Sequence, residues 1–229
     1  MQHAADRAVI LAAGLGTRLK WLTHNRPKAL MQLGGMAAIE RVLLRLAANG
    51  VRDVAVNTHH HAPILRDYLG DGSRYGVRLH FSHEPQLLDS GGGVLKALDV
   101  LPGDGPFYIY NADVLTDLPL AELMNRLPGN LGVLGLIPNP AHHPRGDFSL
   151  EHGKVVKHAH ANGATFAGVS LFTPEAFAPF AVGEKFPLTA VMKPLIEQGQ
   201  LGGLIHRGQW FDIGRPRDLL QARAALLKA

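Results

Sequence analysis

Short apolar runs alternate along this chain with segments whose apolar residues recur at helical spacing. The predicted strands are the runs at 8–13, 51–58, 77–82, 106–110 and 131–137, and helices are expected around 39–46, 92–101 and 120–127. Strands that alternate with helices in this way are typical of βαβ units, in which each helix returns the chain to the same sheet. The pattern therefore predicts an α/β fold with a mostly parallel sheet flanked by helices.

The pattern changes after Pro138. Beyond this residue we expect a hairpin of strands 148–150 and 155–158, a further strand at 165–172, and helices over 189–198 and 216–228. No internal repeat, low-complexity segment or linker divides the sequence. We therefore predict a single domain over residues 1–229, in which residues from about 138 to 200 form a subregion.

The composition excludes several function classes. Hydrophobic residues make up 46% and charged residues 18% of the 229 residues, as in globular proteins that bury a sizeable core. The net charge of +4 comes from scattered lysines and arginines, which suits anionic small molecules, and we expect no nucleic-acid partner.

No apolar stretch approaches the length of a membrane span, and residues 1–7 carry no apolar signal segment. We therefore expect no membrane partner and a cytoplasmic location. The absence of cysteine excludes disulfides, thiolate zinc sites and a cysteine nucleophile.

The sequence AVILAAGLGTRL, residues 8–19, passes from a predicted strand into a turn with two glycines. Glycines let backbone N–H groups approach an anion closely. The spacing G-x-x-x-x-G-K-[ST] of a P-loop is absent, and Leu19 stands where the dinucleotide fingerprint requires a small residue. On their own, Gly14 and Gly16 are also compatible with an ordinary tight turn. Arg18 favours phosphate binding, because a guanidinium directly after the turn can fork onto phosphate oxygens.

Lys28 follows this turn in the segment THNRPKAL, where Pro27 restricts the local backbone. A lysine aimed at the same phosphates would neutralise the charge that develops during phosphoryl or nucleotidyl transfer. A single lysine is usually a solvated surface charge. The combination of G-x-G-T-R with a following P-K-x-L is much harder to obtain by chance, and it indicates a reacting triphosphate.

With these residues in place, the chain resembles the sugar-phosphate nucleotidyltransferases, also called sugar nucleotide pyrophosphorylases. Their signature is present as LAAGLGTRLKWLTHNRPKAL, and the resemblance continues through segments 69–82, 87–98, 109–115, 165–172 and 210–214. It implies a Rossmann-like, mostly parallel mixed sheet flanked by helices, of the nucleotide-diphospho-sugar transferase type. The short length and the sequences GDGSRYG, DSGGGVLKAL, HHPRGDF and WFDIG are most similar to the branch that uridylylates N-acetylmuramic acid 1-phosphate in cell-wall sugar recycling.

The reaction of this family joins a nucleoside triphosphate to a sugar 1-phosphate, which attacks the α-phosphorus and displaces pyrophosphate. Because the attacking oxygen is already anionic, catalysis reduces to alignment, charge neutralisation and metal placement. The resemblance implies UTP and N-acetylmuramic acid 1-phosphate as the partners of a monomer or small homo-oligomer. The alternatives are a mannose 1-phosphate guanylyltransferase, a glucose 1-phosphate uridylyl- or thymidylyltransferase, and a non-catalytic regulator that uses the same fold to sense nucleotides.

Two aspartates match the metal-binding positions of the family. Asp113 follows a predicted strand at its carboxyl end, where open α/β sheets bind ligands, and Asp212 lies between aromatic residues in WFDIG. Mg²⁺ prefers oxygen ligands and commonly uses one or two carboxylates together with phosphates. The resemblance therefore implies that Asp113 and Asp212 hold Mg²⁺ as the cofactor, with Ala112 where the family commonly has glycine. A glycosyltransferase is disfavoured, because N-A-D holds only one carboxylate of the usual D-x-D.

The resemblance also assigns the remaining site residues. Arg18 and Lys28 are the expected catalytic residues, in contact with the triphosphate. The predicted nucleotide-binding residues lie in two glycine-containing segments, the second of which opens a predicted helix: Ala12, Ala13, Gly14, Gly16 and Thr17, and then Gly91 and Gly92. The predicted contacts of the sugar substrate are Asp89, Asn111 and Gly168.

One family motif is missing. Many thymidylyl- and uridylyltransferases carry E-K-P, whose lysine grips the sugar phosphate, but the corresponding region here has the sequence VVKHAHANGATFAG. Lys157 is the candidate substrate-binding replacement, and Arg145 and Lys185 are further candidate anion contacts. The choice of sugar therefore depends on loops that carry little local signature.

Overall fold

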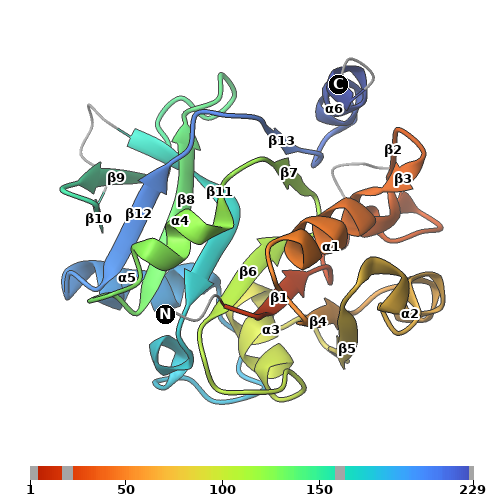
Figure 1. Cartoon of the computed structure of the whole chain (residues 1–229), viewed down its shortest axis with the longest axis horizontal. Coiled ribbons are helices and arrows are strands. Elements are labelled where there is room, and N and C mark those ends of the chain that lie inside the picture. Colours follow the sequence, from red (N-terminus) through yellow and green to blue (C-terminus); the bar gives the residue numbers. More distant parts are fainter. Residues whose placement is uncertain (1–4, 17–22, 158–162, 227–229) are drawn as a thin grey trace.

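The computed structural model describes residues 5–16, 23–157 and 163–226. Nine strands form one sheet in the order β5-β4-β1-β6-β11-β8-β12-β10-β9 (Figure 1). Their bounds are β1 (Arg7–Leu11), β4 (Asp53–Thr58), β5 (Arg78–His83), β6 (Phe107–Asn111), β8 (Gly132–Pro138), β9 (Phe148–Glu151), β10 (Lys154–Val156), β11 (Gly163–Phe172) and β12 (Leu201–Ile205). Two short ribbons pair β2 (Gln32–Leu33) with β3 (Met36–Ala37), and β7 (Val114–Thr116) with β13 (Trp210–Asp212). The helices are α1 (Ala38–Ala48), α2 (Ala62–Leu69), α3 (Asp89–Leu98), α4 (Leu120–Asn125), α5 (Leu188–Glu197) and α6 (Pro216–Leu226), with 3₁₀ turns η2 (Lys28–Leu30), η3 (Ser73–Tyr75) and η4 (Pro174–Phe177).

The large sheet has a parallel half and a mixed half. Strands β5, β4, β1 and β6 run parallel to one another, as the alternation of strands and helices predicts. Strand β11 pairs antiparallel with β6, β8 and β9, and β12 pairs parallel with β8. The predicted hairpin, β9 with β10, continues this end of the sheet through antiparallel pairs. The predicted α/β class with a mixed sheet is therefore confirmed.

Helix α2, strand β12 and the four strands of the two short ribbons have no counterpart in the expectation from sequence. Strand β12 contains Gly202 and Gly203, and glycine is depleted in strands, so its apolar residues give only a weak strand signal. The strands of the ribbons are two or three residues long, which is too short for an alternation of apolar and polar residues to be recognised.

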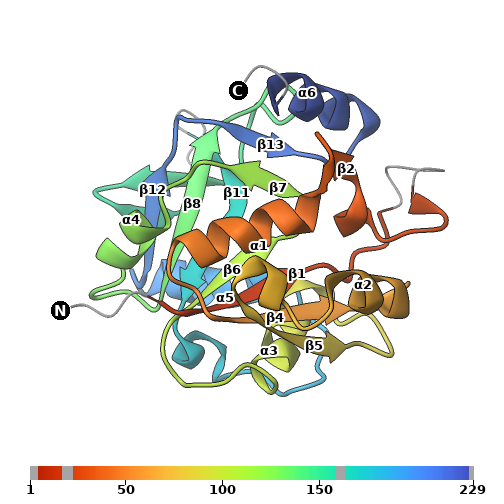
Figure 2. The ribbon, with the colours of Figure 1, turned by 45° about the vertical axis from the view of Figure 1, so that its right-hand side comes forward.

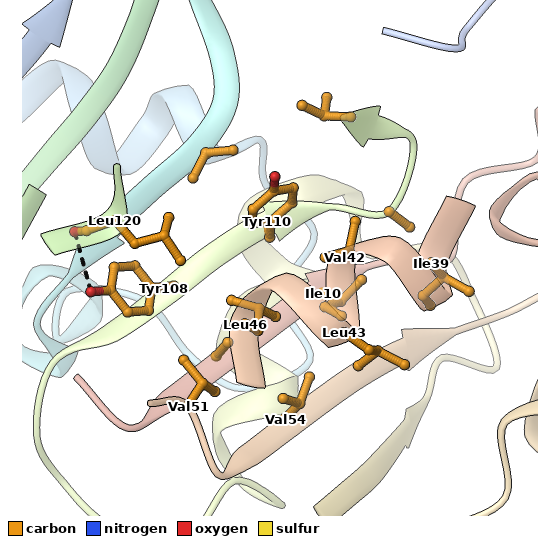
Figure 3. Packing of buried hydrophobic residues seen from close by; sticks show 14 of the residues in the cluster. Ile10, Ile39, Val42, Leu43, Leu46, Val51, Val54, Tyr108, Tyr110 and Leu120 are labelled. Atoms are coloured by element: carbon orange, nitrogen blue, oxygen red, sulfur yellow. Dashed lines mark hydrogen bonds between the residues drawn. The ribbon is translucent and has the colours of Figure 1, made fainter. Parts of the chain in front are cut away.

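Side chains of the parallel strands alternate between two hydrophobic clusters, one on each face of the sheet. Ile10 and Tyr108 belong to the cluster that includes the apolar face of α1, whereas Val9 and Ile109 belong to the cluster that includes α3 and α5. In the first cluster α1 packs on β1, β4 and β6, and the hydroxyl of Tyr108 donates to the carbonyl of Leu120 at 3.3 Å (Figure 3). Helices thus cover both faces of the parallel half. Among the helices of the described ranges, none has the length and apolar character that crossing a membrane requires.

The parallel strands end together at their carboxyl edge. Strands β1, β4 and β6 end at Leu11, Thr58 and Asn111, and the register places Leu11 between Asn57 and Asn111. The ribbon of β7 and β13 follows directly beyond β6 (Figure 2). Open α/β sheets bind their ligands at this edge, so the strands deliver their following loops to the expected position of a site.

The amino edge of the same strands carries paired charges. Arg7, Asp53 and Arg78 are the first residues of β1, β4 and β5 and lie side by side in register. Arg78 donates from Nε to Asp53 at 2.8 Å, and Nε2 of His80 lies 2.9 Å from the same carboxylate. Arg7 donates to two backbone carbonyls of the loop before β6, at 2.8 Å each. These side chains tie the strand starts together.

Candidate active site

The turn after β1 is held in place by β4. The backbone amides of Ala12 and Ala13 donate to Oδ1 of Asn57 at 2.6 and 3.1 Å. Both residues were predicted to bind nucleotide, and in this structure their N–H groups have a partner within the protein. A Cβ added to Gly14 would meet no atom within 4 Å, so Gly14 is the position in the described turn where a ligand can approach the backbone.

Gly16 connects this turn to Lys28. Its φ of +64° is in the left-handed region, and an added Cβ would lie 3.0 Å from the side chain of Thr23 and 3.1 Å from that of Lys28. The hydroxyl of Thr23 donates to the Gly16 carbonyl at 3.0 Å. The glycine therefore allows the turn to pack directly on the segment that carries the lysine. Thr17 and Arg18, also predicted here, lie outside the described residues.

Lys28 and Asp113 form an ion pair at the centre of the site. Lys28 begins the 3₁₀ turn η2 directly after Pro27, and its ammonium group donates to Oδ2 of Asp113. The two side chains are only 12% and 22% exposed, so the pair is partly shielded from water. A cavity of about 240 Å³ opens beside this pair, and its lining includes Gly14, Gly16 and Gly214.

The ribbon of β7 and β13 brings the backbones of the two predicted metal aspartates next to each other. Asp212 pairs with Val114 in the ladder, and the amide of Ile213 donates to the carbonyl of Asp113 at 3.0 Å. Residues far apart in the sequence therefore lie on adjacent rungs. The indole N–H of Trp210 donates to the carbonyl of Ala167 at 2.9 Å, which fixes the ribbon to β11.

The donor set at Asp113 and Asp212 fits Mg²⁺. Within residues 5–16, 23–157 and 163–226, no group of three or more His, Cys, Asp or Glu side chains is arranged to hold a metal. A pair of carboxylates is too small a set to enclose a cation by itself. It is the set with which proteins hold Mg²⁺ when substrate phosphates and water complete the coordination.

Asn111 and Gly168, both predicted to contact the sugar, lie against each other. Gly168 has a φ of +75° and occupies the irregularity in the pairing of β11 with β8, between Phe166 and Ser170. An added Cβ would lie 2.8 Å from Nδ2 of Asn111 and 2.9 Å from Val114. Only glycine combines this backbone conformation with so close an approach, so the bulge sets the position of the Asn111 side chain.

A second cavity, of about 470 Å³, adjoins the first and shares Leu11, Gly14 and Asp113 with it. The rest of its lining consists of Ala13, Asn57, Glu84, Leu87, Asp89, Ser90, Asn111 and Lys185. The predicted residues Asp89 and Asn111 are thus brought to the same cavity as Gly14 and Asp113. Asp89 has a φ of +61°, and its carboxylate accepts from the amide of Ser90 at 2.6 Å.

Asn57 and Glu84 are residues of this cavity for which the sequence yielded no prediction. Nδ2 of Asn57 donates to Glu84 at 2.8 Å, and the other carboxylate oxygen of Glu84 accepts from the amide of Leu88 at 3.0 Å. Glu84 is 1% exposed. The available signal was their position: Asn57 is the penultimate residue of β4 and Glu84 directly follows β5, so both lie at the carboxyl edge of the sheet.

The second glycine segment has a different environment from the first. The amides of Gly91 and Gly92, predicted to bind nucleotide, both donate to the carbonyl of Phe186 at 3.0 Å. An added Cβ would overlap the ring of Phe186 at Gly91 and the carbonyl of Glu184 at Gly92. The prediction assumed free amides at the start of a helix, but here these two amides bind another segment of the chain.

Lys157 is separated from the residues described so far. It donates to Glu197 of α5 at 2.8 Å, and its side chain is 72% exposed. It is absent from the lining of both cavities, whereas Lys185 lines the second one. The structure therefore brings Lys185 to the site and leaves Lys157 outside it.

The Gly14 turn, Lys28 and Asp113 thus border one cavity at the carboxyl edge of an α/β sheet, where such sheets bind their ligands. Asp212, whose backbone lies beside that of Asp113, lines a separate cavity with His142 and Arg215. In a comparison with known proteins, residues 7–130 match the family model described as nucleotidyl transferase. The chain belongs to this family, as its resemblance in sequence implied.

Two relatives match over nearly their whole length. The N-acetylmuramate alpha-1-phosphate uridylyltransferase of Neisseria meningitidis is 37% identical over 225 residues, which cover 95% of this chain and 97% of the relative. The protein of the same name from Caulobacter vibrioides is 32% identical over 244 aligned positions, with full coverage of both chains. Among solved structures, HddC from Yersinia pseudotuberculosis in complex with GMP-PN has a TM-score of 0.81 at 20% identity. That match covers 96% of this chain and 99% of HddC, and it supports the fold.

Proposed function

We propose that this chain is a Mg²⁺-dependent uridylyltransferase that joins UTP to N-acetylmuramic acid 1-phosphate and releases pyrophosphate in the cytoplasm. The observation that carries the proposal is the Lys28–Asp113 pair beside the Gly14 turn, with the backbone of Asp212 next to Asp113 in the ribbon. The names of the two relatives that match over nearly their whole length support the choice of base and sugar.

The proposed step conserves atoms and charge without a catalytic base. An anionic oxygen of the sugar 1-phosphate attacks the α-phosphorus, a new phosphorus–oxygen bond forms, and the bond from the α-phosphorus to the oxygen that bridges it to the β-phosphorus breaks. Pyrophosphate leaves with the electron pair. Because the nucleophile is already ionised, the protein must align the reactants and neutralise the charge that accumulates on the leaving group.

The residues of this chain have separate tasks in that step. Lys28, held by η2 and by its packing on Gly16, places its ammonium group where phosphate charge accumulates. Asp113 and Asp212 would hold Mg²⁺, which when bound neutralises and orients phosphate oxygens. Gly14 leaves the backbone open for the close approach of the nucleotide.

A screen of pyrophosphate release tests the proposal. UTP, GTP, CTP and dTTP are each combined with a panel of sugar 1-phosphates, in Mg²⁺ and again with excess EDTA. We expect UTP with N-acetylmuramic acid 1-phosphate to exceed the other nucleotides by at least about tenfold, roughly 1.4 kcal/mol, and EDTA to abolish the signal.

Other outcomes of the screen would overturn the proposal in distinguishable ways. A preference for GTP with mannose 1-phosphate, or for glucose 1-phosphate with UTP or dTTP, would replace it with another branch of the family. Binding of nucleotide without pyrophosphate release from any pair would replace it with a non-catalytic nucleotide sensor. Undiminished activity in EDTA would remove the metal from the mechanism.

A further inference from the structure

We propose that Lys185 binds the phosphate group of the sugar substrate. The inference rests on the function proposed above. It identifies the lysine that binds the sugar phosphate, a role for which the sequence favoured Lys157. Lys185 lines the cavity that also contains Gly14, Asn111 and Asp113.

The charge of Lys185 has no dedicated carboxylate partner. Among the ion pairs of the described residues, none involves Lys185. Two carboxylates of its cavity are engaged in other contacts: Glu84 accepts from Asn57 and from the Leu88 amide, and Asp89 accepts from the Ser90 amide. An exposed ammonium group at the rim of a cavity is therefore available to an anionic ligand.

The backbone that follows Lys185 is fixed to the start of α3. The Phe186 carbonyl accepts from the amides of Gly91 and Gly92 at 3.0 Å, and the Phe186 amide donates to the Leu88 carbonyl at 3.1 Å. The amide of Leu188 donates to Oγ of Ser90 at 2.9 Å. These bonds pair the amides of Phe186 and Leu188 and the Phe186 carbonyl, so residues 186–188 are held against the start of α3.

The glycines of α3 make this arrangement possible. Phe186 is 5% exposed and stacks on Phe180 with a ring separation of 4.1 Å. At Gly91 a side chain would overlap the Phe186 ring, and at Gly92 it would overlap the Glu184 carbonyl. The glycine segment thus acts by letting residues 184–187 lie on the helix, and this contact holds Lys185 over the cavity.

The geometry of the reaction indicates which phosphate Lys185 takes. The two cavities meet at Asp113 and Gly14, with Lys28 in one and Lys185 in the other. In-line displacement places the attacking and leaving oxygens on opposite sides of the reacting phosphorus. With Lys28 beside the leaving pyrophosphate, Lys185 lies on the side of the attacking phosphate. Asn111 lies on that side as well, in contact with the Gly168 bulge.

The test is a comparison of lysine variants in steady-state kinetics of pyrophosphate release, with UTP and N-acetylmuramic acid 1-phosphate varied separately. We expect Lys185→Ala to raise KM for the sugar 1-phosphate at least about tenfold and to change KM for UTP less than about threefold. Lys185→Arg should restore part of the loss. Lys193→Ala, at an exposed position on the neighbouring helix α5, is the matched control and should behave like the wild type.

Three results would overturn the proposal: an unchanged KM for the sugar 1-phosphate in Lys185→Ala, a rise confined to UTP, or the same defect in Lys157→Ala with none in Lys185→Ala. Gly92→Ala provides a second test, because it keeps the Lys185 side chain but displaces the backbone segment that carries it. If this variant is folded by circular dichroism, it should raise KM for the sugar 1-phosphate in the same direction. A wild-type value in the folded variant would contradict the role of the glycines.

Failure of the proposed function gives a different result. If the wild type releases no pyrophosphate from any pair, the function proposed above fails. The Lys185 assignment is then decided by calorimetric titration with N-acetylmuramic acid 1-phosphate alone. Binding that is present in the wild type and Lys193→Ala but at least about tenfold weaker in Lys185→Ala supports the assignment, and equal or absent binding in all three overturns it.

Discussion

The two ends of the parallel strands carry similar charged residues with different partners. At the amino edge, Arg7, Asp53 and Arg78 lie in register and are bonded to one another's strands and loops. At the carboxyl edge, Lys28 and Asp113 border two cavities. The charged side chains of the amino edge bind neighbouring strands and loops, whereas the Lys28–Asp113 pair of the carboxyl edge lines cavities. The surroundings of a charged residue therefore decide whether it serves stability or chemistry.

The ionisation of the amino edge follows from these contacts. The hydrogen bond from Arg78 holds the pKa of Asp53 below its ordinary value, and that from His80 acts in the same direction. Burial lowers the pKa of Arg7, while nearby aspartates oppose this effect. A carboxylate whose charged form is stabilised in the folded state contributes to folding, and Asp53 is such a carboxylate.

The largest predicted effect is at Asp113. Asp113→Asn and Asp212→Asn should each lower pyrophosphate release by at least about a thousandfold, because each removes a carboxylate from the proposed metal pair. Thermal melting should stay near that of the wild type. Asp53→Asn, at the other end of the strands, is the control and should keep its activity. Full activity in either of the first two variants would refute the metal site.

Lys28→Ala is expected to lower kcat by about a hundredfold, with a smaller change in KM for UTP. The physical reason is that the ammonium group acts on charge that develops only as pyrophosphate leaves. Steady-state kinetics with UTP varied at saturating sugar 1-phosphate make the measurement. A loss confined to KM would contradict a role in the transition state.

Gly14→Ala should raise KM for UTP by about tenfold without lowering the melting temperature, because the added methyl group enters open space that the proposed nucleotide occupies. Gly16→Ala is the contrast within the same turn. It places a side chain at a φ of +64° and against Thr23 and Lys28, so it should destabilise the fold by about 1 kcal/mol or more. Equal stability losses in both variants would contradict this division.

The smallest effect is at the amino edge. Asp53→Asn should reduce the free energy of unfolding in urea by about 1 kcal/mol at pH 7, because Asp53 is largely buried whereas its partner Arg78 is mostly exposed and screened. Activity should be retained. A loss of pyrophosphate release in this variant would contradict the conclusion that the amino edge contributes to stability and not to activity.

The same variant has an expected pH dependence. Since the folded-state pKa of Asp53 is lowered, its stabilisation is complete above the unfolded-state pKa of about 3.9 and is lost as the pH falls through the folded-state value. The difference in unfolding free energy between wild type and Asp53→Asn should therefore shrink below about pH 4. A difference that persists unchanged at lower pH would show that the carboxylate charge is not its source.

Local sequence patterns predicted the features that depend on neighbouring residues, such as strands and turns. The apolar runs located the strands of the parallel half, and the turn after β1 was recognised from its glycines. Only the resemblance related Asp113 to Asp212, because the ribbon that places their backbones side by side is too short to leave a pattern.

Features that depend on long-range contacts were not predictable. The glycines at 91 and 92 have the composition of a phosphate-binding turn, and only their contact with residues 184–186 reveals their packing role. The sequence favoured Lys157 over Lys185 as the substrate contact, because Lys157 lies in the region that corresponds to the missing E-K-P motif. The tertiary structure favours the other lysine: Lys185 lines the second cavity, whereas Lys157 forms an ion pair with Glu197.

The β7–β13 ribbon has a consequence for how the protein is made and maintained. Its two aspartates come from the middle and the end of the chain, so a partly synthesised or truncated chain that lacks β13 cannot offer both carboxylates at once. A ligand that needs both binds only the completed fold. At about one hundred times its Kd such a ligand adds about 2.7 kcal/mol to the free energy of unfolding. We therefore expect the cell's pool of substrate to act as a conformational safeguard, which protects finished molecules and leaves incomplete ones open to proteolysis.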